Sequence, residues 1–172
     1  MRSITQLVIH HSASPTGSVE TITRDHVARG FETIGYHNVI GNGRPLPDGH
    51  ISAGRPHEKI GAGVFDANSG KLQVCLIGNF ARSDEGYTGP PTEKQLDSLG
   101  HWILTNLKRY GVRSSEIYGH REVAVKGHGT LCPGISGKAL REIRRWALEM
   151  QRDGAQCPLS AWLHEKVGKD LL

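Results

Sequence analysis

Short apolar runs along the chain predict the strands of a buried sheet. Residues 5–10 and 72–78 each contain a continuous apolar run, without the strict alternation of a strand that has one face in water. Strands of this kind are covered on both faces, as in the sheets of α/β proteins. Residues 35–40 and 116–118 contain fewer apolar residues, and we interpret them as two further strands.

Apolar residues at helical spacing predict long helices between and after these strands. The first helix is expected near residues 19–29, and the second follows Thr92 and Gln95, which are spaced as a capping box. The third is expected over residues 137–152. The buried stripes of the last two helices comprise Leu96, Leu99, Ile103, Leu107 and Tyr110, and then Leu140, Ile143, Ala147 and Met150. The residues placed on the solvent side of the third helix are Arg141, Arg144 and Arg145.

Composition favours one loop-rich α/β domain and argues against two other classes. A chain of 172 residues can bury a proper core, and its 22 glycines cluster in the connections. The net charge of +4 favours anionic partners. The chain has no helix-turn-helix, no zinc-finger spacing and no interleaving of aromatic and basic residues, so nucleic acid is not an expected partner. No apolar run is long enough for a membrane span, so membrane insertion is not expected.

The cysteine count and the first residues of the chain indicate where the protein is synthesised. Three cysteines, an odd number, argue against a disulfide framework. The apolar segment before His10 is too short for a signal peptide. We therefore expect synthesis in the cytoplasm without an export signal.

Histidine and cysteine residues at the ends of the predicted strands indicate a metal site. The first apolar run ends in His10 and His11, and the loop of residues 119–134 contains His120 and Cys132. One histidine from a strand end, with a histidine and a cysteine from a loop, can form a three-ligand zinc site with an open fourth position. Taken singly, a strand-end histidine or a cysteine is more simply a buried core residue. Adjacent strand residues point to opposite faces, so His10 and His11 cannot easily share one ion, and His11 is assigned to packing or support.

Six short motifs give the site a family context. IHHSAS, GYHNVI, AGRP, CLIGN, GHREV and CPG follow one another between residues 7 and 146. In this order they resemble the zinc N-acetylmuramoyl-L-alanine amidases, the family that includes amidase-type phage lysozymes and peptidoglycan-recognition proteins. The resemblance implies a single α/β domain over residues 1–153, with a central mixed sheet, about three long flanking helices and zinc in a surface groove. Residues 154–172 lie outside it and are expected to form a tail with a short helix that docks through Trp162 and Leu163.

The resemblance also assigns roles to individual residues. It makes His10, His120 and Cys132 the zinc ligands, Tyr36 the catalytic tyrosine and Thr130 a second group beside the developing oxyanion.

The remaining histidines receive no such role. His26 and His37 are expected to pack near the site without binding metal, and His128 to be a mobile surface residue. The sequence departs from the family pattern at Gly63, where the family usually has a histidine. This departure removes a polar group that would face the substrate. Asn68 fits the family pattern.

The expected reaction is hydrolysis, by zinc-activated water, of the amide between N-acetylmuramic acid and L-alanine in peptidoglycan. A monomeric phage endolysin is the preferred interpretation, and it would act on the cell wall or periplasmic peptidoglycan after release. A wall-recycling enzyme and a secreted effector would have the same chemistry. A non-catalytic peptidoglycan-binding module on the same scaffold is the alternative from another class, and the presence of Cys132 disfavours it.

Overall fold

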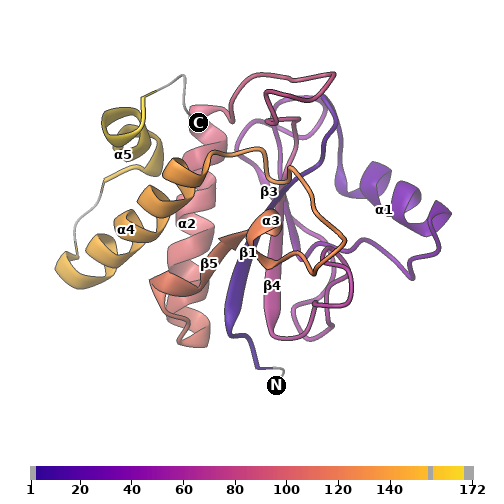
Figure 1. Ribbon diagram of the computed structural model, residues 1–172, viewed down its shortest axis with the longest axis horizontal. Coiled ribbons are helices and arrows are strands. Elements are labelled where there is room, and N and C mark those ends of the chain that lie inside the picture. The colour runs from indigo at the N-terminus through magenta and orange to yellow at the C-terminus, as the bar shows by residue number, and fades with distance from the viewer. Residues whose placement is uncertain (1–2, 155–156, 169–172) are drawn as a thin grey trace.

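The protein folds around a five-stranded sheet with helices on both sides (Figure 1). The computed structural model describes residues 3–154 and 157–168. The strands are β1 (Gln6–His11), β2 (Asn38–Ile40), β3 (Ile51–Ala53), β4 (Lys71–Leu76) and β5 (Ile117–Gly119). The helices are α1 (Val19–Ala28), α2 (Glu93–Tyr110), α3 (His120–Val123), α4 (Gly137–Asp153) and α5 (Leu159–Lys166), and a 3-10 turn covers Ser114–Glu116. No helix in the described ranges has both the length and the apolar character of a membrane span.

The sheet is mixed, as expected from the sequence. Its strand order is β3-β2-β4-β1-β5, in which β2, β4, β1 and β5 are parallel and β3 pairs antiparallel with β2 at one edge. The three longest helices, α1, α2 and α4, flank this sheet. The predicted α/β class with a central mixed sheet and about three long helices is confirmed.

Alternation along the central strands separates an apolar face from a polar one. Leu7 and Ile9 of β1 belong to the main core, which includes residues of α2, α4 and α5. In β4 the corresponding residues are Leu72, Val74 and Leu76. Because strand side chains alternate between faces, His10 points to the opposite face of the sheet. The parallel register pairs His10 with Cys75, so polar and thiol groups meet on that face.

Local sequence signals set the ends of α2. The Thr92 hydroxyl accepts from Gln95 N at 3.0 Å, and the Gln95 side chain accepts from Thr92 N at 3.1 Å, which completes the predicted capping box. The helix ends at Gly111, whose φ of 65° favours glycine.

Helix α1 buries Ile22 and His26, and Ile22 joins a smaller cluster with Val39 and Ile77 on the other side of the sheet.

Two expectations from the sequence were wrong in detail. The strand predicted over residues 35–40 pairs as a strand only at Asn38–Ile40, because Tyr36 bonds to a loop instead. Arg55 N donates to Tyr36 O at 2.8 Å in that loop. Arg144 was expected to face solvent, but it donates to Ile117 O at 2.6 Å and forms an ion pair with Glu122.

Helix α5 packs against α2 and α4, on the side of the molecule opposite α1 (Figure 1). Leu163 is fully buried and Trp162 is 9% exposed, and both belong to the main core. The Trp146 indole N–H also donates to Cys157 O at 2.9 Å. The division at residue 153 stays a prediction, and residues 155–156 and 169–172 of the expected tail lie outside the described ranges.

Leu163→Ala is expected to destabilise the fold without changing metal content. Removing a fully buried leucine leaves a cavity and costs about 2 to 5 kcal/mol. Urea unfolding measures the loss, with Leu148→Ala as the matched control because Leu148 is 53% exposed on α4. Equal stability of the two variants would show that α5 contributes little to the core.

Candidate active site

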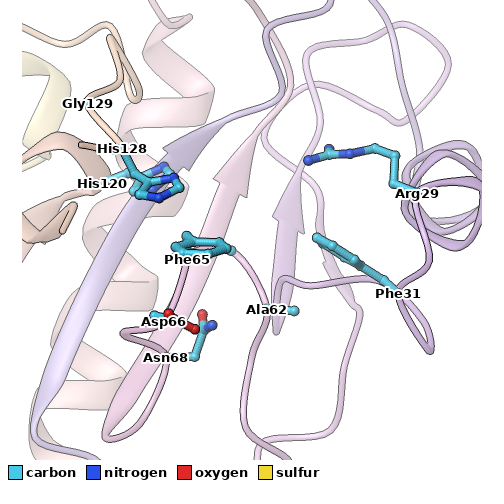
Figure 2. Close-up of a pocket in the computed structure, with 10 residues that line it drawn as sticks. Arg29, Phe31, Ala62, Phe65, Asp66, Asn68, His120, His128 and Gly129 are labelled. Atoms are coloured by element: carbon cyan, nitrogen blue, oxygen red, sulfur yellow. The ribbon is translucent and has the colours of Figure 1, made fainter. Parts of the chain in front are cut away.

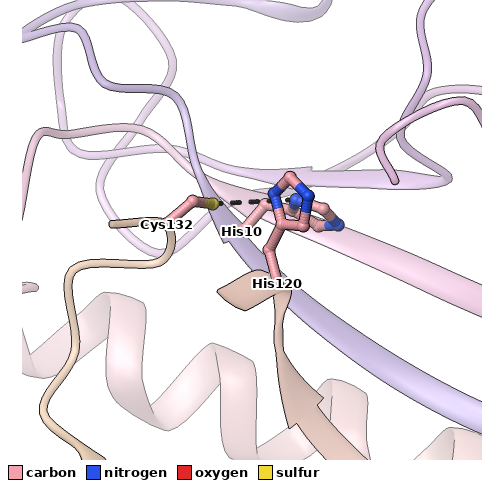
Figure 3. A group of neighbouring side chains, drawn as sticks. All are labelled: His10, His120 and Cys132. Carbon is pink, nitrogen blue, oxygen red and sulfur yellow. Dashed lines mark hydrogen bonds between the residues drawn. The ribbon is translucent and has the colours of Figure 1, made fainter. Parts of the chain in front are cut away.

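Three side chains that could hold a metal ion meet at one edge of the sheet (Figure 3). The ligand atoms of His10, His120 and Cys132 all lie within 4.8 Å of one another. His10 is near the carboxyl end of β1, and His120 follows the last residue of β5. These two strands are parallel neighbours, so their carboxyl ends meet at the same edge. In open α/β sheets, that edge is where ligands usually bind.

Cys132 reaches the two histidines from a loop attached to the start of α3. Arg121 N donates to Cys132 O at 2.9 Å, which ties the loop to the helix. The Cys132 sulfur accepts from His11 N at 3.3 Å and lies 3.7 Å from His10 Nδ1. Burial raises the pKa of the thiol to about 12, and the His11 N–H and the charge of Arg121 oppose this rise. The thiol is therefore protonated at neutral pH, and it would have to lose this proton to bind a metal ion.

Both imidazoles are neutral at neutral pH. Burial, followed by repulsion from His120, lowers the pKa of His10 well below its usual value. Burial also lowers the pKa of His120, which is half-buried. Neutral rings keep a lone pair available for a metal.

The donor set fits zinc. Two neutral imidazoles and one cysteine are a ligand combination typical of a catalytic zinc site. Tetrahedral nitrogen and sulfur ligands lie about 3.6 Å apart at usual zinc bond lengths. The 3.7 Å between His10 Nδ1 and Cys132 Sγ agrees with this value. The structure thus brings the three predicted ligands together, and their role as ligands stays a prediction.

A cavity of about 500 Å³ opens beside His120 (Figure 2). On one side it is lined by Arg29 and Phe31, which follow α1, and on the other by Phe65 and His128. Phe65 is 57% exposed and stacks on His128, with ring centroids 4.0 Å apart and planes 16° from parallel. His128, expected as a mobile surface residue, thus has a defined aromatic partner.

Tyr36 lies beside the three-residue group. Its ring centroid is 4.9 Å from that of His10 and 5.3 Å from that of His26. Burial, with the nearby thiols Cys75 and Cys132, raises the pKa of Tyr36 well above its usual value. The hydroxyl therefore stays protonated at neutral pH and can donate a hydrogen bond.

Thr130 is half-buried in the loop before Cys132. Its hydroxyl oxygen accepts from Cys132 N at 3.1 Å, so part of its role is to hold the backbone of that cysteine. The hydroxyl proton can still be donated to another acceptor.

The other histidines of this region are held by backbone groups. His11 is on the opposite face of β1, where its Nδ1 accepts from Phe80 N at 3.2 Å. His26 Nδ1 accepts from Gly35 N at 2.9 Å, and His37 Nδ1 accepts from Gln73 N at 3.0 Å. These contacts agree with the packing roles expected for the three residues.

Comparison with known proteins identifies the family. The family model of N-acetylmuramoyl-L-alanine amidase matches residues 1–135. The chain belongs to this amidase family. An endolysin of Klebsiella phage KP32 is 29% identical over 146 residues, covering 82% of this chain and 83% of the phage protein. Peptidoglycan-recognition protein SD of Drosophila simulans is 30% identical over 122 residues, covering 70% of this chain and 58% of the fly protein.

Solved structures share the amidase-family fold. The N-acetylmuramoyl-L-alanine amidase LysC of Clostridium intestinale superposes with a TM-score of 0.67 at 24% identity, covering 84% of this chain and 85% of that one. Drosophila peptidoglycan-recognition protein SD superposes with a TM-score of 0.64 at 22% identity, covering 92% and 86%. The family contains both amidases and recognition proteins, so activity has to be argued from the site.

Three residues that border this site belong to none of the sequence motifs. Phe65 and Arg29 line the cavity, but no local pattern marked them. Gln73 is fully buried in the middle of β4. Gln73 could have been noticed because it is a polar residue inside a continuous apolar run, and a buried amide needs a hydrogen-bond partner.

Proposed function

We propose that this protein is a zinc-dependent amidase that hydrolyses the bond between the lactyl group of N-acetylmuramic acid and L-alanine in peptidoglycan. The main support is the group of His10, His120 and Cys132 beside an open cavity, in a chain of the amidase family. Two neutral ligands and one anion would leave a zinc ion with net positive charge.

His10, His120 and Cys132 would hold the zinc in this proposal. Bound zinc supplies Lewis-acid polarisation of a carbonyl oxygen and lowers the pKa of water. Tyr36, kept protonated by burial, donates a hydrogen bond to the oxygen on which negative charge develops. The Thr130 hydroxyl is a second donor, and it also fixes the backbone of Cys132.

The cavity is suited to a peptide joined to a sugar. The exposed Phe65 ring, stacked on His128, offers a flat apolar surface. Across the cavity, the Arg29 guanidinium lies 5.2 Å from the centroid of the Phe31 ring. This cation suits the carboxylate groups of a stem peptide, because the charges are complementary.

A phage endolysin is the biological role we propose. Two phage endolysins, of Klebsiella phage KP32 and Enterobacteria phage K11, each match more than four fifths of this chain at 29% and 28% identity. In this role the protein is made in the cytoplasm, acts as a monomer and reaches peptidoglycan after release.

The second candidate is a peptidoglycan-binding module without turnover, because recognition proteins are also among the relatives. Cys132 argues against it, since the thiol completes a three-ligand set that binding alone would not require.

The bond that is cut tests the proposed reaction. Purified peptidoglycan digested with the protein should gain free L-alanine amino termini, with no increase in reducing sugar ends. Amino-terminal labelling followed by mass spectrometry measures the first, and a reducing-sugar assay measures the second. Reducing ends without new amino termini would identify a glycosidase and overturn the proposal.

A further inference from the structure

Gln73 is a buried polar residue on the same face of the sheet as His10. It is fully buried and pairs in register with Val8, whereas His10 pairs with Cys75. Gln73 is therefore the diagonal neighbour of His10 across two adjacent strands, at a separation that a long side chain can bridge. A buried amide needs donors and acceptors around it, so its partners define what it does.

One end of the Gln73 amide is fixed by a chain of hydrogen bonds. Val64 N donates to Asn68 Oδ1 at 2.9 Å, and a backbone N–H can only donate. This contact identifies the Asn68 atom as the oxygen. Gln73 Nε2 donates to the same oxygen at 2.9 Å. The NH₂ end of Gln73 thus points to Asn68, and its carbonyl oxygen is left for another partner.

The other end of the amide faces His10. Gln73 Oε1 and His10 Nε2 are both buried, and neither has a hydrogen-bond partner in the structure as described. Gln73 Oε1 and the His10 ring both lie around the point that a Cβ atom at Gly63 would occupy, so the two groups are near one another. With the proton of His10 on Nε2, a small movement of Gln73 Oε1 toward His10 Nε2 would form a hydrogen bond between these two atoms.

The loop of residues 61–63 passes close to the Gln73 amide. A Cβ atom at Gly63 would lie 2.2 Å from Gln73 Oε1 and 3.1 Å from His10 Cε1. A Cβ atom at Gly61 would lie 2.5 Å from Gln73 Nε2. Any side chain at either position would displace the amide. Glycine at residue 63, a departure from the family pattern, is what allows Gln73 to reach the histidine.

We infer that Gln73 is a positioning residue that accepts a hydrogen bond from His10 Nε2–H and thereby directs Nδ1 toward Cys132 and the metal. The inference rests on the proposed zinc site. The neutral ring has one donor and one acceptor nitrogen, and a partner on one side decides which is which. His10 Nδ1, 3.7 Å from Cys132 Sγ, is then the nitrogen with the free lone pair. A chain of hydrogen bonds would then lead from the Val64 backbone N–H, through the side chains of Asn68 and Gln73, to the imidazole of His10.

Zinc affinity of Gln73→Met tests this role. Methionine keeps the length of the side chain and removes the acceptor, so zinc affinity should fall by roughly 10- to 100-fold in competition with a chromogenic chelator. Gln95→Met is the matched control, because Gln95 is equally buried but donates to Ile77 O at 2.8 Å, away from the three-residue group. It should lose stability and keep zinc affinity.

Two further measurements keep the test decisive. Should Gln73→Met fail to fold, Gly61→Ala displaces the amide by a different route, because its Cβ atom would lie 2.5 Å from Gln73 Nε2, and it should weaken zinc binding similarly. In the zinc-free wild type, nitrogen-15 NMR should place the proton of neutral His10 on Nε2. A proton on Nδ1, or unchanged zinc affinity in both variants, would overturn the role of Gln73 alone. Wild-type protein that binds no zinc would overturn the proposed function as well.

Discussion

Cys132→Ala is expected to weaken zinc binding by roughly a hundredfold, and peptidoglycan hydrolysis should fall with the zinc content. The wild type should hold about one zinc per chain. Cys132 is the only anionic donor in the group, so its removal leaves two neutral imidazoles. Structural zinc sites bind with about 10 to 16 kcal/mol shared among four ligands, so one ligand is worth about 3 kcal/mol, or roughly a hundredfold in affinity. Elemental analysis after dialysis, together with the hydrolysis rate, measures the effect.

Cys75→Ala provides the matched control for this experiment. Cys75 is also a buried thiol, and it stands opposite His10 in the strand register. It is not a member of the three-residue group, so its loss should affect packing only. The alanine variant should retain zinc and hydrolysis. Equal zinc in the wild type and Cys132→Ala would remove Cys132 from the site.

Tyr36→Phe should leave the fold and zinc content intact while turnover falls by about two to three orders of magnitude. Phenylalanine keeps the ring that packs 4.9 Å from the His10 centroid and removes only the hydroxyl. Substrate affinity should change much less, because the donor acts on charge that develops in the transition state. Separate measurement of kcat, KM and zinc content distinguishes these effects.

Tyr110→Phe is the control for loss of a hydroxyl elsewhere. The Tyr110 hydroxyl lies 2.8 Å from His57 Nδ1 at the end of α2, so its removal should affect stability and not turnover. Near-normal turnover in Tyr36→Phe with full zinc would mean that the ring only packs. Loss of zinc would mean that Tyr36 supports the metal site instead of the reaction.

Much of the fold followed from local patterns in the sequence. The apolar runs of β1 and β4 and the capping residues of α2 were sufficient, because burial and capping act over a few neighbouring residues. The start of β2 was predicted too early, because Tyr36 O bonds to the loop at Arg55 and not to a strand. That choice depends on a segment whose position local patterns do not encode.

The three residues that could hold a metal ion were predictable, because sequence motifs contain them. His10 and His120 follow strand signals, and parallel strands bring such ends together. The stack of Phe65 on His128 joins residues far apart in the chain, and nothing local predicts it. The approach of Gln73 to His10 depends on the exact pairing of β1 with β4, which a sequence pattern leaves open.

The most direct test is peptidoglycan hydrolysis before and after removal of the metal. The protein should release L-alanine amino termini from purified peptidoglycan, lose this activity after dialysis against a chelator, and recover it with about one equivalent of zinc per chain. Sedimentation with peptidoglycan should be measured on the same samples. Hydrolysis that is insensitive to chelation would contradict the zinc mechanism, and binding to peptidoglycan without any new amino termini would show a recognition module instead of an amidase.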